Sequence, residues 1–303
     1  MRACIIIPTY NGGALWERVA TSIQKNVSNA RDVLVIDSGS TDNTVIIAKK
    51  HNFTLKKIEK KNFNHGGTRN LAFDLHHANY DIAIFLTQDA IPEPNFVTEI
   101  CKVFDDPMVA CAYGRQLPHD DANPISMHAR YFNYPEISYV VTALDKEKMG
   151  MRTVFLSNSF SAYRVSTFSK IGQFPSNTIL SEDMFFAAQS IIAGYKVAYV
   201  SDAKVKHSHN YSFKEEFKRY FDIGVFHRNE SWIREKFGGA GGEGKRFILS
   251  ELNYLIRNNP SYIPISMLNN VCKIIGYKLG QYYNYLPKSI VKKISMHKGY
   301  WRG

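Results

Sequence analysis

The chain has 303 residues, of which 45% are hydrophobic and 21% are charged. This composition argues against disorder and allows one large domain, or one domain with a smaller appendage. No run of about 18 apolar residues occurs, and Met1–Pro8 is too short and too soon interrupted by proline for a signal peptide. We therefore expect a cytoplasmic protein. Since the cysteines show no Cys-x-x-Cys spacing, we expect reduced thiols at Cys4, Cys101, Cys111 and Cys272.

The net charge of +11 is concentrated near the end of the chain. From residue 245 onward, ten lysines and arginines accompany a single acid, Glu251, so this stretch carries +9. Such a stretch can bind nucleic acid or the anionic face of a membrane, at about 1 kcal/mol per basic residue near a lipid surface. It can equally be a solvated basic face, and charge alone leaves these alternatives open.

Short β-branched runs alternate with helical spacing through the first 115 residues, which is typical of buried parallel strands joined by helices. The sequence predicts an open α/β sheet, Rossmann-like and mostly parallel, with helices on both faces. Pro8, Asp37 and Asp89 follow three of the strands, at the edge where such sheets bind ligands. The predicted strands are Ala3–Pro8, Val33–Asp37, Thr54–Glu59, Ile82–Thr87 and Val109–Gly114, and the later helices are 42–51, 68–78 and 96–104.

The second half of the chain is less regular. Residues 117–151 are rich in Pro, His and Tyr, and we expect them to cover the side of the site where an acceptor substrate would bind. A helix should begin near Ser181 and end at Gly194. Lys196–Val200 with Ala203–His207 predicts a strand or hairpin, and 213–236 predicts one amphipathic helix. After glycine-rich 238–244, two more helical stretches complete a division into residues 1–212 and a basic helical region, 213–303.

Two segments are suited to a nucleotide diphosphate. Asp37 and Ser38 begin a flexible turn before a helix, which fits a base edge and a ribose, although a plain helix cap explains them too. Gly66 and Gly67 allow a ligand to approach the backbone, and Arg69 offers a charge-assisted fork to a diphosphate. A helix entry with a solvent-facing arginine is the alternative.

A second set of residues is suited to metal-assisted group transfer. Asp89 follows a strand, where a carboxylate can hold a divalent cation that bridges two phosphates. His207 and His209 are two residues apart on a predicted strand and therefore face the same way. The acidic pair Glu182 and Asp183 begins an apolar helix, and an ionised carboxylate is the usual general base for such a transfer.

One motif, taken alone, would suggest an ATPase. Residues 239–245 match the Gly-x-x-x-x-Gly-Lys pattern of a phosphate loop, but Arg246 replaces the hydroxyl residue that binds magnesium. The segment also follows a polar helix and not a strand. We therefore interpret it as a glycine-rich connection.

Taken in order, these motifs resemble the family-2 glycosyltransferases of the GT-A fold, and most closely the bacterial rhamnosyltransferases of surface polysaccharide synthesis. The likeness spans nearly the whole chain. It is carried by the stretches 5–11, 63–72, 85–90, 157–159, 181–183, 207–212, 219–224 and 241–246. Two departures stand out: Asp37-Ser38 replaces an Asp-Asp pair common in the family, and Thr87-Gln88-Asp89 keeps only the last acid of Asp-x-Asp.

The resemblance implies a role for each matching residue. Asp183 would be the catalytic base, and Asp89 with His207 would bind Mg²⁺ or Mn²⁺. Asn158, Glu182 and His209 would line the acceptor or donor-sugar pocket. The nucleotide would lie against Pro8, Thr9, Tyr10, Asn11, Asp37, Ser38, Arg69 and Gln88.

The resemblance also implies an inverting transfer of a sugar to a lipid-linked oligosaccharide, with dTDP-β-L-rhamnose as donor; a UDP- or GDP-sugar is the alternative. The apolar positions of a C-terminal helix fit either a peripheral site on the inner face of the plasma membrane or packing within the protein. They are Ile274, Ile275, Leu279, Tyr282, Tyr283 and Leu286. The rival classes are a nucleotidyltransferase and a basic nucleic-acid-binding protein. A nucleotidyltransferase normally needs a basic, glycine-rich loop directly after the first strand, and Pro8–Gly13 carries no cation. We expect no nucleic acid partner.

Overall fold

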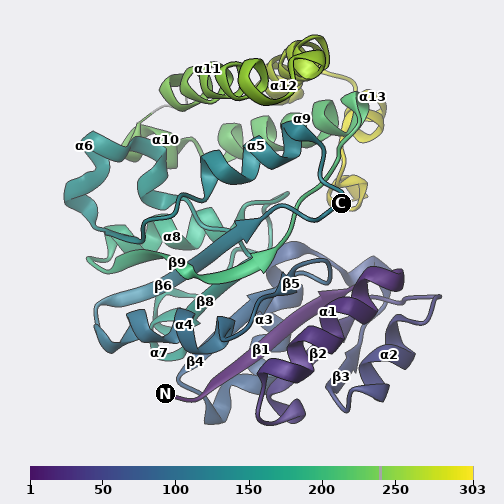
Figure 1. Ribbon diagram of the computed structural model, residues 1–303, viewed down its shortest axis with the longest axis vertical. Helices are drawn as coiled ribbons and strands as arrows, with labels where there is room; N and C mark the ends of the chain where they lie inside the picture. Colours follow the sequence, from purple (N-terminus) through teal and green to yellow (C-terminus); the bar gives the residue numbers. More distant parts are fainter. Residues whose placement is uncertain (239–240, 303) are drawn as a thin grey trace.

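The computed structural model describes residues 1–238 and 241–302 (Figure 1). The strands run from the first residues to the middle of the chain: β1 (Ala3–Thr9), β2 (Val33–Asp37), β3 (Thr54–Lys57), β4 (Ile82–Leu86), β5 (Ile91–Pro92), β6 (Val109–Leu117), β7 (Tyr139–Val141), β8 (Phe160–Arg164) and β9 (Lys196–Lys206). Each predicted strand of the first 115 residues is present, with ends shifted by at most three residues.

The helices cover both faces of the sheet and build a separate layer at the C-terminal end. They are α1 (Gly13–Asn26), α2 (Thr44–Lys50), α3 (His65–His76), α4 (Phe96–Lys102), α5 (Pro124–Asn133), α6 (Lys146–Met149), α7 (Val165–Ile171), α8 (Glu182–Ile192), α9 (Phe213–Asn229), α10 (Ser231–Phe237), α11 (Gly241–Asn258), α12 (Ile263–Gln281) and α13 (Lys288–Ile294). Among the described residues, no helix is long and apolar enough to cross a membrane.

The strands of the described chain form one sheet in the order β3-β2-β1-β4-β8-β6-β9-β5, with β7 paired to β9. The ladders place β1, β2, β3, β4, β6 and β9 in one direction and β5, β7 and β8 in the other. The prediction of a mostly parallel α/β sheet is confirmed. However, β8 enters between β4 and β6, and the sequence analysis did not predict this strand.

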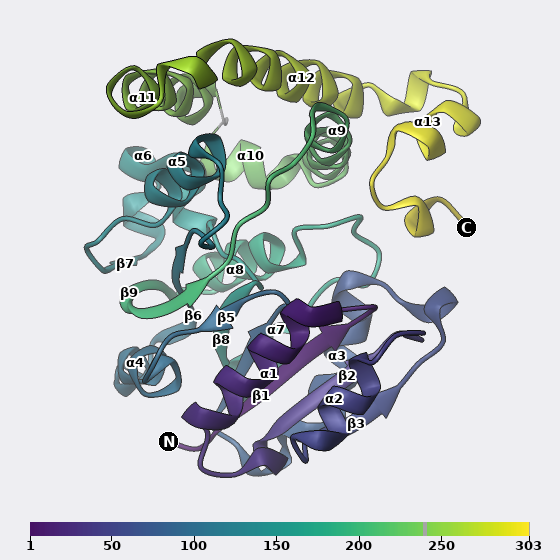
Figure 2. The ribbon, with the colours of Figure 1, turned by 45° about the vertical axis from the view of Figure 1, so that its right-hand side comes forward.

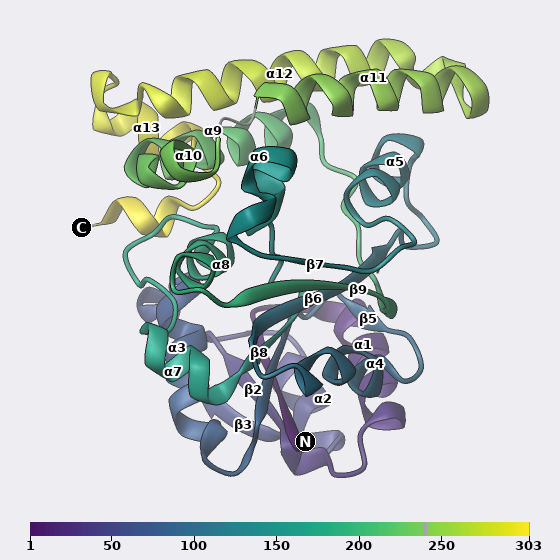
Figure 3. The same ribbon diagram turned by 90° about the vertical axis from the view of Figure 1, so that its left-hand side faces the viewer.

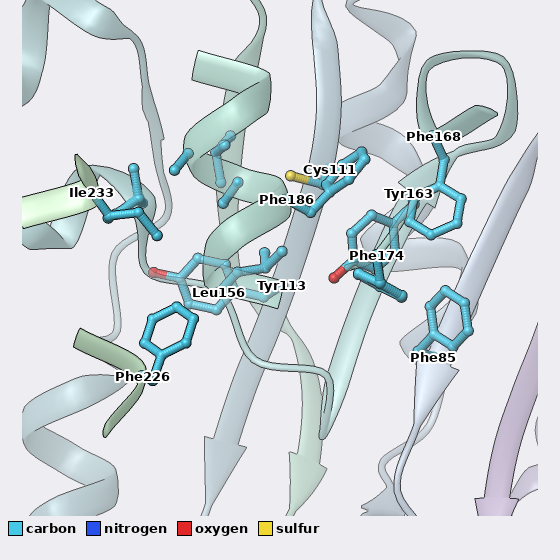
Figure 4. Packing of buried hydrophobic residues seen from close by; sticks show 14 of the residues in the cluster. Phe85, Cys111, Tyr113, Leu156, Tyr163, Phe168, Phe174, Phe186, Phe226 and Ile233 are labelled. Atoms are coloured by element: carbon cyan, nitrogen blue, oxygen red, sulfur yellow. The ribbon is translucent and has the colours of Figure 1, made fainter. Parts of the chain in front are cut away.

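Alternate residues of the central strands pack on opposite faces, as expected for strands buried on both sides. Ile5 and Ile7 pack against α1, α2 and α4, whereas Cys4 and Ile6 face the core beneath α3, α7 and α8. The second core is rich in aromatic rings, including Tyr163 (Figure 4). Helices therefore cover both faces, as the sequence predicts.

The outermost layer consists of α11 and α12, with α5 and α9 between it and the sheet (Figures 2 and 3). Helices α9 and α12 cross in close backbone contact because glycines meet there. A Cβ atom built on Gly280 would lie 2.0 Å from the Phe221 carbonyl oxygen, and one on Gly276 would lie 2.3 Å from that of Phe217. Side chains larger than hydrogen cannot fit at this crossing.

Two local predictions need correction, and one alternative is decided. The expected single helix over 213–236 is two helices, since the backbone at Glu230 (φ −106°, ψ 45°) leaves the helical region. Of the expected strand or hairpin over 196–207, the strand is confirmed, with an irregularity opposite Gly114 and Arg115. Gly239 and Ala240 of the glycine-rich connection lie outside the described residues, but Gly241–Gly244 belong to the first turns of α11.

Candidate active site

The carboxyl ends of β1 and β2 hold the first group of predicted nucleotide-binding residues. Pro8 lies opposite Ile36 in the β1–β2 ladder. The Asp37 carboxylate, 1% exposed, accepts hydrogen bonds from Thr9 Oγ1 (3.1 Å) and from the backbone N–H of Ser40 (3.0 Å). The Ser38 N–H donates to the Thr9 carbonyl oxygen (2.9 Å). Asp37 therefore holds its own turn closed and presents little free surface; the N-cap residue of α2 is Asn43, not Thr41 or Asp42.

Gln88 joins this edge to the end of β4. Its Oε1 accepts the Tyr10 N–H (2.8 Å), and its Nε2 donates to the Tyr10 carbonyl oxygen (3.0 Å). Asn11, in the left-handed region at φ 46°, accepts the Thr41 N–H (2.8 Å) through its side chain. The loops after β1, β2 and β4 are thus tied into one rigid edge by side-chain amides.

Arg69 is not solvent-facing, so that alternative was wrong. It is 5% exposed, and its Nη1 lies 3.1 Å from Glu182 Oε1, which joins α3 to the start of α8. The neighbouring Gly66 has a packing role: a Cβ there would lie 2.0 Å from the Pro175 carbonyl oxygen. The interpretation of Gly66 as a ligand approach is therefore corrected, because its open side is filled by the chain itself.

Asp183 stands in the first turn of α8 beside this ion pair. Its Oδ2 accepts the Asn158 N–H (2.8 Å), and the Asn158 side chain donates to Glu182 Oε1 (2.8 Å). Ser181 precedes the helix in the left-handed region (φ 60°) without capping it, a strained conformation of the kind that clusters at functional sites. The Asn158 side-chain oxygen in turn accepts hydrogen bonds from the hydroxyls of Ser161 and Tyr163. These bonds fix Asn158, which itself binds both acids.

The two adjacent carboxylates differ in their acidity. Burial raises the pKa of Asp183 to about 7, and the negative charge of Glu182 adds to the rise. For Glu182, burial opposes ionisation, but the charges of Arg69 and His65 prevail and lower its pKa. Two acids whose environments push their pKa values apart divide their roles: Glu182 stays an ionised structural partner, and Asp183 can accept a proton near neutral pH.

Asp89, His207 and His209 form a candidate metal centre. The Nε2 atoms of His207 and His209 each lie 3.5 Å from a different oxygen of Asp89, and one ligand atom from each residue falls within 4.8 Å of the others. Both histidines follow the end of β9 and are not on the strand, as the sequence had suggested. Burial opposes ionisation of Asp89, but His207 and His209 hold its pKa well below the ordinary value.

Gln116, which sequence analysis missed, fixes the orientation of His207. The Gln116 Oε1 accepts from Arg130 Nη1 (2.7 Å), so it is the acceptor for His207 Nδ1 as well (2.9 Å). A neutral His207 then carries its proton on Nδ1 and presents the Nε2 lone pair to the Asp89 carboxylate. A lone pair and a carboxylate facing each other at 3.5 Å fit a bound cation, and the donor set suits a divalent metal.

These groups meet in a cleft of about 550 Å³. Its lining includes seven predicted site residues: Arg69, Asp89, Asn158, Glu182, Asp183, His207 and His209. The residues at the ends of β1 and β2 are not part of this lining. The lining also contains residues that sequence analysis did not assign to the site, from α5, α9, α12 and the C-terminal segment: Arg130, Arg219, Lys273, Met296 and His297.

Known proteins with this sequence pattern are glycosyltransferases. The family model described as "Glycosyl transferase family 2" matches residues 4–172. The O-antigen chain rhamnosyltransferase RfbN of Salmonella typhimurium is 50% identical, over 99% of this chain and 96% of the relative. The O-antigen chain rhamnosyltransferase WbaN of Salmonella anatum is 48% identical, over 98% of this chain and 95% of the relative.

Solved structures agree on the fold. The mannosyltransferase PcManGT from Pyrobaculum calidifontis, in complex with GDP-Man and Mn²⁺, has a TM-score of 0.57 at 18% identity, covering 99% of this chain and 84% of its own. S. aureus TarS in complex with UDP-GlcNAc also scores 0.57, at 15% identity, with 94% and 91% covered. These findings confirm the GT-A fold and favour glycosyl transfer over the nucleotidyltransferase and nucleic-acid-binding alternatives. The chain belongs to glycosyl transferase family 2 and is a glycosyltransferase.

Proposed function

We propose that this enzyme transfers L-rhamnose from dTDP-β-L-rhamnose, with inversion, to a lipid-linked saccharide in surface polysaccharide synthesis. The carrying observation is that Asp183, with its pKa raised to about 7, shares one cleft with Asp89, His207 and His209. The two Salmonella rhamnosyltransferases, similar over nearly their whole length, support the choice of sugar and pathway.

In this mechanism the acceptor hydroxyl gives its proton to the Asp183 carboxylate and attacks the anomeric carbon from the face opposite the nucleotide. One displacement on that face inverts the configuration. Each Asp183 oxygen already accepts one backbone N–H, from Asn158 or Met184, which orients the carboxylate and leaves further lone pairs for the hydroxyl. The neighbouring Glu182 adds negative charge that favours an oxocarbenium-like transition state.

Asp89, His207 and His209 would hold Mg²⁺ or Mn²⁺. When bound, such a cation supplies positive charge that stabilises the departing nucleoside diphosphate. The binding of Mn²⁺ with GDP-Man by the PcManGT structure supports this choice of cofactor. Gln116 keeps the His207 lone pair directed at the site, and His119 Nε2 donates to the Asp89 carbonyl oxygen (3.1 Å), which fixes the loop that carries the carboxylate.

The nucleotide would lie along the rigid edge formed by Pro8, Thr9, Tyr10, Asn11, Asp37, Ser38 and Gln88. Because Asp37 is closed off by its own turn, we expect recognition of the base through backbone groups and the exposed ring of Tyr10. Arg69, which lines the cleft, would help to position the diphosphate through its charge. Asn158, Glu182 and His209 would line the sugar pocket.

The same proposal places the enzyme on the anionic face of a membrane, through α11 and α12. These helices form the layer at one end of the molecule (Figure 3), and several of their apolar side chains are exposed. The surrounding chain is strongly basic, with +9 over residues 245–303, which complements anionic lipid. The exposed apolar residues are Leu249, Leu252, Ile256, Met267, Leu268, Val271, Ile274 and Ile275.

Flotation with phosphatidylglycerol vesicles tests the membrane surface. The triple variant Met267→Ser, Val271→Ser, Ile274→Ser should stay with the soluble fraction, whereas the wild type floats. Ile46→Ser is the matched control, since Ile46 is equally exposed (63%, against 64% for Met267) but lies on α2. Equal flotation of all three proteins would refute the surface.

The donor is tested by nucleoside diphosphate release from dTDP-rhamnose and from UDP- and GDP-sugars, with and without Mg²⁺ or Mn²⁺. A lipid-linked acceptor must be present. Metal-dependent turnover of dTDP-rhamnose supports the proposal. Turnover of another donor in its place would keep the mechanism and overturn the rhamnosyl assignment.

A further inference from the structure

Two arginines line the active-site cleft without a carboxylate partner. Arg130 comes from α5 and Arg219 from α9. Within the described residues, no acidic oxygen lies within 4.0 Å of either guanidinium. Glu216, the nearby acid of α9, is already paired with Lys273 at 3.5 Å. Neither arginine therefore forms an ion pair among the described residues, although the charge of Glu216 acts on both.

Aromatic rings and one amide hold these arginines in place. Arg130 donates to Gln116 Oε1 (2.7 Å), and its guanidinium carbon lies 5.4 Å from the centre of the Tyr134 ring. The guanidinium carbon of Arg219 lies 5.8 Å from the centre of the Tyr211 ring. Contacts to ring faces leave the edges of a guanidinium free, and those edges carry its hydrogen-bond donors.

The charge of Arg219 acts on Arg130. Burial lowers the pKa of the Arg130 guanidinium, and the positive charge of Arg219 lowers it further. For Arg219 itself, burial opposes the charge, but Tyr211, Tyr220 and Glu216 raise its pKa. Like charges in a partly desolvated cleft repel, and an anion placed between them relieves that repulsion. Two planar guanidinium groups are the side chains best suited to bind phosphate oxygens in pairs.

Arg130 adjoins the metal centre, because Gln116 accepts from both Arg130 and His207, but the helices that carry the pair extend away from the nucleotide edge. The residues proposed for the nucleotide lie at the ends of β1 and β2, toward one edge of the sheet. Helices α5 and α9 follow β6 and β9, toward the other edge, and they lie between the sheet and the α11–α12 layer (Figures 2 and 3). An acceptor carried on a lipid at that layer would enter the cleft past the two arginines.

We propose that Arg130 and Arg219 form a subsite for the phosphate groups of the acceptor, distinct from the place of the donor diphosphate. This inference rests on the proposed transfer to a lipid-linked saccharide. The subsite holds the acceptor by its phosphates so that the sugar hydroxyl reaches Asp183. It adds a second anion-binding element to a cleft whose metal centre serves the donor.

The test compares acceptors that differ only in the phosphate. One set consists of alkyl diphosphate hexosides, with galactose, glucose, mannose or N-acetylglucosamine as the hexose; the other consists of the same alkyl hexosides without the diphosphate. The wild type should prefer the diphosphate acceptor by about 10- to 100-fold in kcat/KM, the value of a charge-assisted pair. Arg219→Gln should lose most of that preference through a higher acceptor KM, and Arg219→Lys should keep part of it.

Arg228→Gln is the matched control, because Arg228 is an exposed residue of the same helix outside the cleft lining. It should behave as wild type. An equal preference in wild type and Arg219→Gln would overturn the subsite, as would a wild type that ignores the diphosphate. A higher donor KM with an unchanged acceptor preference would assign Arg219 to the donor and also overturn it. The ratio is measured with whichever donor is turned over, so a wrong rhamnosyl assignment leaves this test intact.

Discussion

The site has two regions of different construction, the sheet wall and the helical wall. The sheet wall comprises the ends of β1, β2 and β4, of which only the β4 end reaches the lining of the cleft; it is held by side chains that bind neighbouring backbone, such as Asp37 with its own turn and Gln88 with Tyr10. The helical wall consists of α5, α9, α12 and the C-terminal segment. There Arg130 and Arg219 have no acidic partner among the described residues.

This difference separates a fixed surface from one that can respond to its ligand. A wall whose polar groups are already satisfied presents a fixed surface, which suits a donor of constant shape. A wall with unneutralised charges depends on its ligand for neutralisation, so changes there alter acceptor choice without disturbing the donor edge. The predictions below act on the corner where the walls meet, on the metal centre, on the helical wall and on proton transfer.

The largest effect is expected at the corner, where Asp183 lies. Asp183→Asn removes the proposed base while keeping size and one hydrogen-bond acceptor, so kcat should fall by about 1,000-fold or more with little change in donor KM. Turnover with dTDP-rhamnose and a lipid-linked acceptor measures it, and thermal unfolding verifies the fold. Asp202→Asn, an exposed residue of β9, is the control. A kcat within tenfold of wild type would remove Asp183 from the mechanism.

Substitution of a metal ligand should weaken metal binding more than substitution of its hydrogen-bond partner. Loss of an outer partner of a metal ligand typically weakens metal binding by about 10- to 100-fold, so loss of a ligand should cost at least about 100-fold. His207→Ala should therefore raise the Mn²⁺ concentration for half-maximal activity more than Gln116→Leu, which removes no ligand but the acceptor that His207 Nδ1 shares with Arg130. Calorimetric Mn²⁺ titration checks the order. The centre would be misassigned if both variants bound Mn²⁺ as the wild type does.

The sequence predicts the sheet wall well because its signals are local. Each of β1, β2 and β4 is a short apolar run that ends in polar residues, and strand ends of a parallel sheet must share an edge. Asp89, Asp183 and His207 were selected from three separate motifs, and the structure brings them to one cleft. The roles proposed for them stay predictions.

Other features of the site depend on contacts between distant segments, which a sequence pattern does not reveal. They are the ion pair of Arg69 with Glu182, the place of β8 in the sheet and the helical wall. Arg69 was expected to face solvent or a diphosphate, but its partner Glu182 lies on another helix. The strand β8 is short, and its place between β4 and β6 is set by pairing on both sides. Arg219 was part of a quoted motif, yet nothing local distinguishes it from an exposed cation. Its place in the lining of the cleft follows from the position of α9, which packs in a close crossing against α12.

That crossing gives the third prediction. Gly280→Ala places a methyl group 2.0 Å from the Phe221 carbonyl oxygen, so α9 and α12 must separate, at a cost of about 1–3 kcal/mol in the free energy of unfolding. The acceptor KM should rise more than the donor KM, because the displaced helices carry the helical wall. Chemical denaturation and steady-state kinetics measure the two effects. Gly244→Ala, with open space around the new Cβ, should not destabilise; equal effects on both substrates would contradict separate walls.

The smallest effect is a pH dependence set by the same corner. Burial and the charge of Glu182 raise the pKa of Asp183 to about 7. A base works only when deprotonated, so kcat should rise about tenfold per pH unit below that value and level off above it. Glu182→Gln removes the negative neighbour while the Arg69 charge remains, which lowers the pKa of Asp183 and should move the midpoint of the pH–kcat profile to lower pH. A midpoint that stays in place, or moves upward, would show that the titrating group is not next to Glu182.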